Sequence, residues 1–443
     1  MTEDPKDVLN SLGERAVQRA VGVVGDSFYN NPTELQHVEA FGSGLLARRK
    51  DLKYPENPAI SENLELVGQG PLPIRFRGKD HFVTAAAFRI DGHIGHEALA
   101  IFTEGDLPLE EQRIKVVVED HIDLVVQAEG GGSIWAEMDG SLGSILNDGG
   151  GILLLPQHMR TATDEQRMNI GRNAARIVGL SPNKVDLISD TRNVLGEQKT
   201  SISIPMDKLT ETISLPMLEE KGLKVSSSEY VMLPFSEFPF VHLEVYPVED
   251  PLTRHHVWVY QENKDDRVKG SSGVAFRPHS ACSSSEVMGA SNCDCPDQLD
   301  AAFQHIVNEG KGVIMYLDQE ARGHGVWAKV ATWHLNIGAK KDLFEAFNAA
   351  GLSEDVRDFN HAAAVLEALG IKSISLMSNN GTVKGDGLET AGVVVQSMRS
   401  IHPHHTAHQS EYTEMDLFAK KHDRGDAMDN ESVVADPMKL RRH

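Results

Sequence analysis

The spacing of apolar side chains changes along this 443-residue chain and divides it into parts. Residues 7–25 carry apolar side chains at helical spacing, which predicts an amphipathic helix. From Pro73 to Leu155 the pattern becomes a series of short apolar runs separated by glycine-containing turns, which is typical of a β-rich domain. The runs predicted as strands are HFVTAAAFRI, HEALAIF, RIKVVVEDHIDLVV, SIWAEM and GILLL. Helical spacing returns over residues 163–180, so the first half is predicted to be a mixed α+β region.

Two glycine triplets interrupt these predicted strands, at residues 130–132 and 149–151. The N–H groups of such a triplet can cradle a phosphate, but neither triplet follows a strand and opens a helix in a GxGxxG frame. Turns are therefore the favoured interpretation. Residues 195–228 are rich in Ser, Lys and Glu, and we expect them to form a connector to the second half.

In the second half, a predicted helix and strand lead to a loop rich in ionisable residues. Pro296 suits the first turn of a helix, and apolar side chains recur at helical spacing as far as Gly310. The apolar run VIMYL, residues 313–317, predicts a strand, and DQEARGHG follows at residues 318–325. Loops at the carboxyl ends of strands carry the functional groups of α/β folds, so we expect this loop at the active site. A solvated connection is the alternative.

The cysteines of the chain lie in one polar stretch with the spacing C-x10-C-x-C: Cys282, Cys293 and Cys295. Three thiolates without a fourth protein ligand cannot complete a structural zinc site, whereas three protein ligands and an open position are typical of catalytic zinc. Reduced core thiols, or two of the cysteines joined in a disulfide, are the alternative. Because core cysteines are not expected to crowd into one polar loop, the metal site is favoured.

An ordered set of motifs surrounds these cysteines. The motifs are RPHSAC (277–282), CDCPDQL (293–299), GVIMYLDQEARGHG (312–325), EDVRDF (354–359) and SNN (378–380). Together they resemble GTP cyclohydrolase II, the family of zinc enzymes that opens the imidazole ring of GTP. The resemblance covers roughly residues 229–397. It implies the catalytic fold of that family, a nucleotide substrate and a two-fold homodimer.

The resemblance also implies roles for single residues. It makes Cys282, Cys293 and Cys295 the ligands of Zn²⁺ and leaves room for Mg²⁺ on the substrate phosphates. Asp355 matches the general base of the family, and Arg357 matches its arginine nucleophile, which attacks the α-phosphate. The substrate-binding positions that it implies are Arg277, His279, Ser280, Gln298, Glu320, Arg322, His324, Trp333, Ser378 and Lys384.

Several positions depart from the family pattern. The usual HSEC is HSAC, so Ala281 stands beside the first zinc ligand, and QEGRGIGL has become QEARGHGV. Trp333 stands where the family has a catalytic Tyr, and Leu343 stands at or near a nucleotide-binding Thr. Trp cannot deliver a hydroxyl proton, and a Leu side chain forms no hydrogen bonds. The departures spare the metal ligands and alter the nucleotide pocket.

The chemistry of these residue types agrees with that division. Zinc held by three thiolates lowers the pKa of a bound water and makes hydroxide available near neutral pH. Asp355 can move protons, while Arg322 and Arg357 offer forked donors that match phosphate oxygens. Asp355 and Arg357 are two residues apart near a predicted helix start, where their side chains would point in different directions, so a simple ion pair is not expected. An exposed charge cluster is the alternative.

Composition narrows the class of partner. The formal net charge of −22 argues against a nucleic-acid partner, whose phosphates need a basic face. A nucleotide must then find a local basic pocket, which Arg277, Arg322, Arg357 and Lys384 can supply. Few cysteines, no secretory apolar segment at the N-terminus and no apolar run long enough to span a membrane predict a cytoplasmic protein without a membrane partner.

The predicted fold is α/β, mixed with α+β: a GTP cyclohydrolase II-like catalytic domain preceded by a β-rich α+β domain. The expected parts are a helical segment (1–70), an α+β domain with its connector (71–228), the zinc catalytic domain (229–400) and a charged tail (401–443). The tail carries His402, His404, His405 and His408, for which a solvated segment is favoured over a second metal site.

Three functions follow from these observations. The acidic RENEGD-type motif of dihydroxybutanone phosphate synthase, the usual fused partner in riboflavin synthesis, is absent from the first half. The altered pocket and this absence favour a branch of the family associated with uracil catabolism, in which a uridine nucleotide (UMP or UTP) is opened. GTP ring opening with release of formate and pyrophosphate is the first alternative. A non-catalytic nucleotide-binding regulator is the second, and the retained cysteines argue against it.

Overall fold

The structure of the chain is a computed structural model that describes an N-terminal sheet, a C-terminal α/β region and a short outlying strand. The described residues are 64–76, 79–90, 97–104, 114–118, 150–156, 164–177, 185–187, 202–231, 233, 236–250, 253–262, 267–286, 290, 293, 295–333, 343–379, 381–402 and 433–434. The helix predicted over residues 7–25, the strand SIWAEM and the first glycine triplet lie outside them.

The N-terminal region is a six-stranded sheet in the order β1-β2-β3-β5-β4-β6. Its strands are β1 (Leu64–Phe76), β2 (Lys79–Ile90), β3 (Glu97–Glu104), β4 (Ile114–Val118), β5 (Gly150–Pro156) and β6 (Val185–Leu187). Neighbours from β1 to β5 are antiparallel, whereas β4 pairs in parallel with β5 and β6. Helix α6 (Asp164–Ile177) packs on this sheet. The β-rich α+β prediction for this part of the chain is therefore confirmed.

The C-terminal region is built on an eight-stranded sheet in the order β14-β13-β11-β12-β10-β9-β8-β7. Its strands are β7 (Ile202–Ser203), β8 (Leu223–Val231), β9 (Phe240–Pro247), β10 (His255–Gln261), β11 (Val274–Ser280), β12 (Lys311–Leu317), β13 (Ile374–Met377) and β14 (Val395–Arg399). The pairs that join β12, β11, β13 and β14 are parallel, and those from β12 to β7 are antiparallel. A mixed sheet results, and its parallel part places the carboxyl ends of four strands at one edge.

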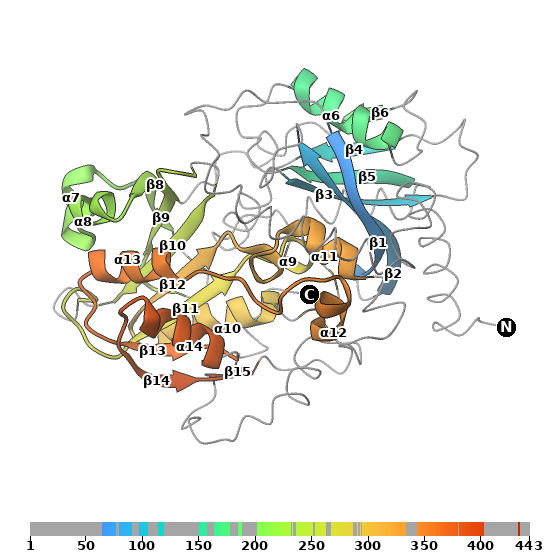
Figure 1. Cartoon of the computed structure of the whole chain (residues 1–443). Coiled ribbons are helices and arrows are strands. Elements are labelled where there is room, and N and C mark those ends of the chain that lie inside the picture. Colours follow the sequence, from blue (N-terminus) through green and yellow to red (C-terminus); the bar gives the residue numbers. More distant parts are fainter. Residues whose placement is uncertain are drawn as a thin grey trace.

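Helices cover both faces of this sheet (Figure 1). They are α7 (Met206–Thr212), α8 (Leu215–Glu220), α9 (Ser283–Glu286), α10 (Cys295–Asn308), α11 (Val326–Trp333), α12 (Leu343–Ala349), α13 (Asn360–Ala368) and α14 (Gly381–Thr390), with the 3-10 turn η3 (Glu320–Gly323). Leu209, Leu218, Val365 and Leu388 bury α7, α8, α13 and α14 in one core. On the other face, Phe303 of α10 packs edge-on against Trp258 of β10.

Several elements differ from the sequence-based expectation. The stretch predicted as a connector, residues 195–228, contains α7, α8 and most of β8, and it extends the C-terminal sheet. β1 begins at Leu64, inside the segment expected to be helical. The second glycine triplet leads into β5 at Gly150. In the tail, β15 (Ile401–His402) pairs in parallel with β16 (Val433–Val434).

Within the described residues, no helix is both long and apolar enough to cross a membrane.

Candidate active site

The site lies at the edge where three parallel strands end. β11, β12 and β13 run in the same direction, and their last residues are Ser280, Leu317 and Met377. The chain continues from these ends into Cys282, Glu320 and Ser378. Functional groups gather at the carboxyl ends of parallel strands. The DQEARGHG loop follows β12 and therefore lies at this edge of the sheet.

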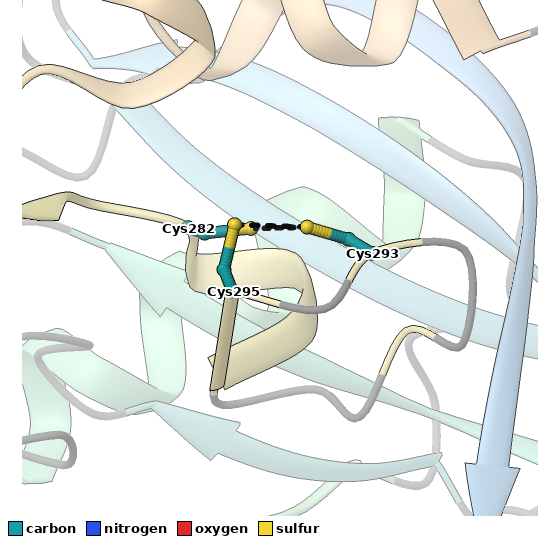
Figure 2. Close-up of side chains that lie close together, drawn as sticks. All are labelled: Cys282, Cys293 and Cys295. Carbon is teal, nitrogen blue, oxygen red and sulfur yellow. Dashed lines mark hydrogen bonds between the residues drawn. The ribbon is translucent and has the colours of Figure 1, made fainter. Parts of the chain in front are cut away.

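The cysteines form a compact triad in which every sulfur lies within 4.8 Å of the others. Cys282 follows β11, Cys295 begins α10, and Cys293 approaches from the intervening loop (Figure 2). The Sγ atoms of Cys282 and Cys293 are 3.6 Å apart, and those of Cys293 and Cys295 are 2.9 Å apart. All three thiols are free. The alternative of a disulfide is not what the geometry shows.

The triad fits a zinc ion. Zn–S bonds of about 2.3 Å at tetrahedral angles place sulfur atoms roughly 3.8 Å apart, so shifts below about 1 Å suffice. The Nζ atom of Lys329 lies 2.9 Å from Cys282 Sγ. Hydrogen bonds from Cys293 and Cys295, together with Lys329, hold the pKa of Cys282 well below its usual value. A thiolate is the form of cysteine that binds metals.

Glu320 contacts two residues that lie next to Cys282, namely Ser283 and Lys329. One carboxylate oxygen accepts from Ser283 N (3.1 Å) and Oγ (2.6 Å), and the other accepts from Lys329 Nζ (2.8 Å). Glu320 is buried. The sequence predicted Glu320 as a substrate contact, whereas its bonds point to a positioning role. Sequence reasoning missed Lys329, which stands nine positions after Glu320 in an apolar helix and carries no motif of its own.

A second buried carboxylate, Glu286, contacts the backbone at Cys282. It accepts from Cys282 N (3.0 Å) and from the Tyr316 hydroxyl (2.5 Å), and it contacts His279 Nε2 at 2.6 Å. Burial lowers the pKa of His279, and Glu286 opposes that shift. His279 thus contacts the same carboxylate that accepts from Cys282 N. Sequence reasoning did not single out Glu286 or Tyr316.

Arg277 reaches from β11 toward α10. Its Nη2 donates to Gln298 Oε1 (2.7 Å), and its Nη1 donates to the carbonyl of Met377 (3.1 Å). Arg277 is buried. These bonds tie α10, and with it Cys295, to the end of β13.

Asp355 and Arg357 form an ion pair, so the prediction that they would point apart is wrong. Arg357 Nε lies 2.9 Å from Asp355 Oδ1, and Nη2 contacts Oδ2. The segment precedes α13, which begins only at Asn360. The helical spacing rule does not apply there, because side chains two apart lie on the same side of an extended chain. Burial alone would raise the pKa of Asp355, but the hydrogen bonds from Arg357 outweigh it and lower the pKa.

The loop that follows β12 contacts the backbone of the segment that carries Asp355 and Arg357. Ala321 (φ 50°) and Arg322 (φ 57°) both adopt left-handed backbone conformations, which non-glycine residues rarely do. Gly323 also has a positive φ, and an added Cβ would lie 3.3 Å from Arg357 N. Arg322 accepts from Val356 N through its carbonyl (3.1 Å). His324 Nε2 donates to the carbonyl of Ser353 (2.8 Å). The strained turn thus fixes the segment that carries Asp355.

Two cationic side chains, Arg357 and Lys384, reach the end of β11. Arg357 Nη1 donates to Ser280 Oγ (3.2 Å), and Lys384 Nζ donates to the carbonyl of Pro278 (2.6 Å). Lys384 is buried, and burial together with Arg277 and Arg357 lowers its pKa well below the usual value. A bound anion would offset the repulsion among these cations. The cluster is suited to hold a phosphate.

Three further positions of the predicted nucleotide pocket follow β13 or lie at helix ends. Ser378 is buried, and its N–H donates to the carbonyl of Arg399 (2.9 Å). Trp333 is the last residue of α11, and Leu343 is the first of α12. The side chains of Trp333 and Leu343 lie outside the described part of the structure.

Comparison with known proteins agrees with this geometry. The model of the GTP cyclohydrolase II family matches residues 232–400. A GTP cyclohydrolase-2 of Pseudomonas putida (strain GB-1) is 38% identical over 139 residues, which are 31% of this chain and 67% of the relative. The chain belongs to the GTP cyclohydrolase II family. It is therefore a hydrolase that acts on C–N bonds in cyclic amidines, and its family is generally zinc-dependent.

Two other relatives are also similar over part of this chain. A GTP cyclohydrolase-2 of Xylella fastidiosa (strain Temecula1) is 35% identical over 154 residues, 34% of this chain and 38% of the relative. The riboflavin biosynthesis protein RibBA of Endomicrobium trichonymphae is 38% identical over 128 residues, 29% of this chain and 31% of the relative. The match to the family model, residues 232–400, begins after the N-terminal sheet.

Proposed function

We propose that this GTP cyclohydrolase II family member is a zinc enzyme that opens the base of a uridine nucleotide, UMP or UTP, in uracil catabolism. The observation that carries the proposal is the position of the cysteine triad beside an intact Asp355–Arg357 pair and Lys384, combined with Trp333 and Leu343 in place of hydroxyl side chains. The retained groups serve hydrolysis and phosphate binding. The changed ones alter base recognition.

The residues have distinct roles in this proposal. Cys282, Cys293 and Cys295 would hold zinc, which would lower the pKa of a water ligand and so supply a nucleophile near neutral pH. Arg357 and Lys384 bind and orient the phosphate. Asp355 is held ionised by Arg357 and accepts a proton from the attacking water. Hydrolysis adds OH to C4, the ring carbonyl carbon that is bonded to N3 but not to N1, breaks the C4–N3 bond and returns the proton to N3, which yields a ureido product and a carboxylate.

Base recognition favours the smaller ring. A guanine site needs hydrogen-bonding groups for a carbonyl and an exocyclic amine, and such sites strongly reject ligands that lack them. Trp333 and Leu343 offer apolar surface, and an indole provides a face on which a small ring can stack. GTP is the second candidate substrate, because the relatives named above are GTP cyclohydrolases.

Turnover on a nucleotide panel tests the proposal. The zinc-loaded protein is incubated with UMP, UTP and GTP while base absorbance and formate are followed, with Cys293→Ser as the inactive control. We expect kcat/KM for a uridine nucleotide to exceed that for GTP by at least about tenfold, or about 1.4 kcal/mol. Formate release from GTP with both uridine nucleotides untouched would instead establish the GTP activity. Turnover of none of the three would favour a nucleotide-binding regulator.

Three accompanying proposals concern assembly, metal and location. We expect a homodimer, because two-fold dimers are the commonest closed assemblies and the family resemblance implies one. Light scattering at micromolar protein that gives a monomer mass would contradict it. Turnover with and without added Mg²⁺ tests whether that ion accompanies the phosphates, and fractionation of cells tests the predicted cytoplasmic location.

A further inference from the structure

The outer edge of the N-terminal sheet reaches the loop that carries the cysteines. Ile74 of β1 forms an isolated antiparallel bridge with Ala290, which lies between Cys282 and Cys293. Both bridge residues are buried. Ala290 also donates its N–H to the carbonyl of Ser284 (2.9 Å), beside the first cysteine. Because β1 is an edge strand, its unpaired side is available for this contact.

A second contact joins the same sheet to the metal site. Helix α11 packs against β1, β2 and β3, and Figure 1 shows β1 and β2 passing beside it. Ala328 and Val330 of this helix are fully buried. Lys329 stands between them and contacts both Cys282 Sγ (2.9 Å) and Glu320 Oε1 (2.8 Å). The sheet therefore supports both the loop between the cysteines and the cation beside Cys282.

We propose that the N-terminal sheet is a positioning part of the metal centre. By holding the loop at Ala290 and the helix that carries Lys329, it orders the ligands before the metal arrives, so less conformational entropy is lost on binding. This contribution comes from outside the region that matches the family, which begins at residue 232. It requires only that the triad binds zinc and does not depend on which nucleotide is opened.

Hydrogen exchange on the intact full-length chain tests the coupling. If β1 stabilises the metal site, the metal must stabilise β1, because coupling between two sites is reciprocal. Adding zinc to the metal-stripped protein should slow exchange of the amides in residues 64–76 by about fivefold or more. The α6 peptide, residues 164–177, serves as the reference in the same domain. Exchange in residues 64–76 that is the same with and without zinc would overturn the proposal.

A matched pair of variants tests the contact directly. Ile74→Ala removes buried side-chain volume at the bridge, whereas Phe88→Leu loosens β2 roughly 25 Å away along the ladder. We expect Ile74→Ala to release zinc to a chelator about fivefold faster than the parent, and Phe88→Leu to stay within about twofold. Reaction of the thiols with a disulfide reagent reports on the triad alone, since the chain has no other cysteines.

Each outcome of that pair is decisive. Equal release rates from the two variants would show that general loosening of the sheet, and not the bridge, governs retention. If Ile74→Ala does not fold, Ile74→Val removes one methylene group and is expected to release zinc about twofold faster than the parent. Nucleotide turnover is not used, so failure of this proposal can be told apart from failure of the proposed function.

Discussion

Arg357 forms a forked ion pair with Asp355, in which Nε lies 2.9 Å from Oδ1 and Nη2 contacts Oδ2. The remaining guanidinium nitrogen, Nη1, donates to Ser280 Oγ at the end of β11. One arginine thus links the segment before α13 to the strand that leads into Cys282. An ammonium group cannot form two parallel bonds to a carboxylate and reach a third acceptor.

Replacing Arg357 by Lys should therefore affect turnover more than affinity. If Arg357 only bound phosphate, Arg357→Lys would raise KM more than it lowers kcat. Because the fork also sets the position of Asp355, we expect kcat to fall by about tenfold or more with a smaller change in KM. Steady-state kinetics on the preferred nucleotide measure both. Kinetics indistinguishable from the parent would remove Arg357 from the site.

The same ion pair predicts a dependence of stability on pH. The pKa of Asp355 in the folded protein lies below its ordinary value, 3.8, so the pair stabilises the fold above the ordinary pKa. That stabilisation is lost as pH falls through the lower, folded-state pKa. Asp355→Asn should thus lower the free energy of unfolding at pH 7. The difference in unfolding free energy between parent and variant should shrink as pH falls below about 4.

Denaturant unfolding of the parent and variant from neutral to acidic pH measures that difference. Asp207→Asn, at an exposed acid on α7, is the control for loss of one negative charge. A destabilisation by Asp355→Asn that stays constant down to strongly acidic pH would contradict the assigned direction of the pKa shift.

The sequence was a good guide wherever apolar spacing was regular. β12 and α10 appear where VIMYL and the run after Pro296 predicted them. β1 was missed because LELVGQGPLPIRF contains Gly68, Gly70, Pro71 and Pro73, which indicate turns. An edge strand tolerates proline since one side of its backbone lacks ladder bonds. Composition cannot show that a strand will lie at an edge.

The candidate site was predictable in its residue types and less so in its contacts. The cysteine spacing and the loop after β12 identified the triad and its surroundings. The roles of Lys329 and Glu286 depend on tertiary packing, since each reaches Cys282 from another turn or helix. The Asp355–Arg357 pair was missed because the two residues were expected to lie near a helix start, whereas the backbone stays non-helical until Asn360.

Removing one thiolate should remove the metal. Cys293→Ser replaces a soft ligand by a hydroxyl, which is a poor ligand for such a zinc site. We expect bound zinc and nucleotide turnover to be lost together, and elemental analysis of the purified variant measures the first. Ser285→Ala, which deletes a hydroxyl 2.9 Å from Cys282 Sγ without deleting a thiolate, is the control and should retain zinc. Stoichiometric zinc with normal turnover in Cys293→Ser would exclude this triad as the metal site.

His324 offers the sharpest test of how the loop after β12 positions Asp355. Its Nε2–H donates to the carbonyl of Ser353 (2.8 Å), two residues before Asp355, and its ring packs on Phe347. A glutamine amide nitrogen can occupy the place of Nε2, whereas that of asparagine falls short. We expect His324→Gln to keep kcat within about threefold of the parent, and His324→Asn and His324→Leu to lower it by about tenfold or more.

The control for these variants is His361→Gln, which removes another partly buried imidazole, one that pairs with His255. A general loss of stability would lower the melting temperature of His324→Asn and His361→Gln alike and leave kcat of the folded fraction unchanged. A positioning role predicts instead that kcat separates Gln from Asn at position 324 while their melting temperatures stay close. Equal kcat for those two variants, or full turnover by His324→Leu, would show that the hydrogen bond to Ser353 does not set the geometry of Asp355.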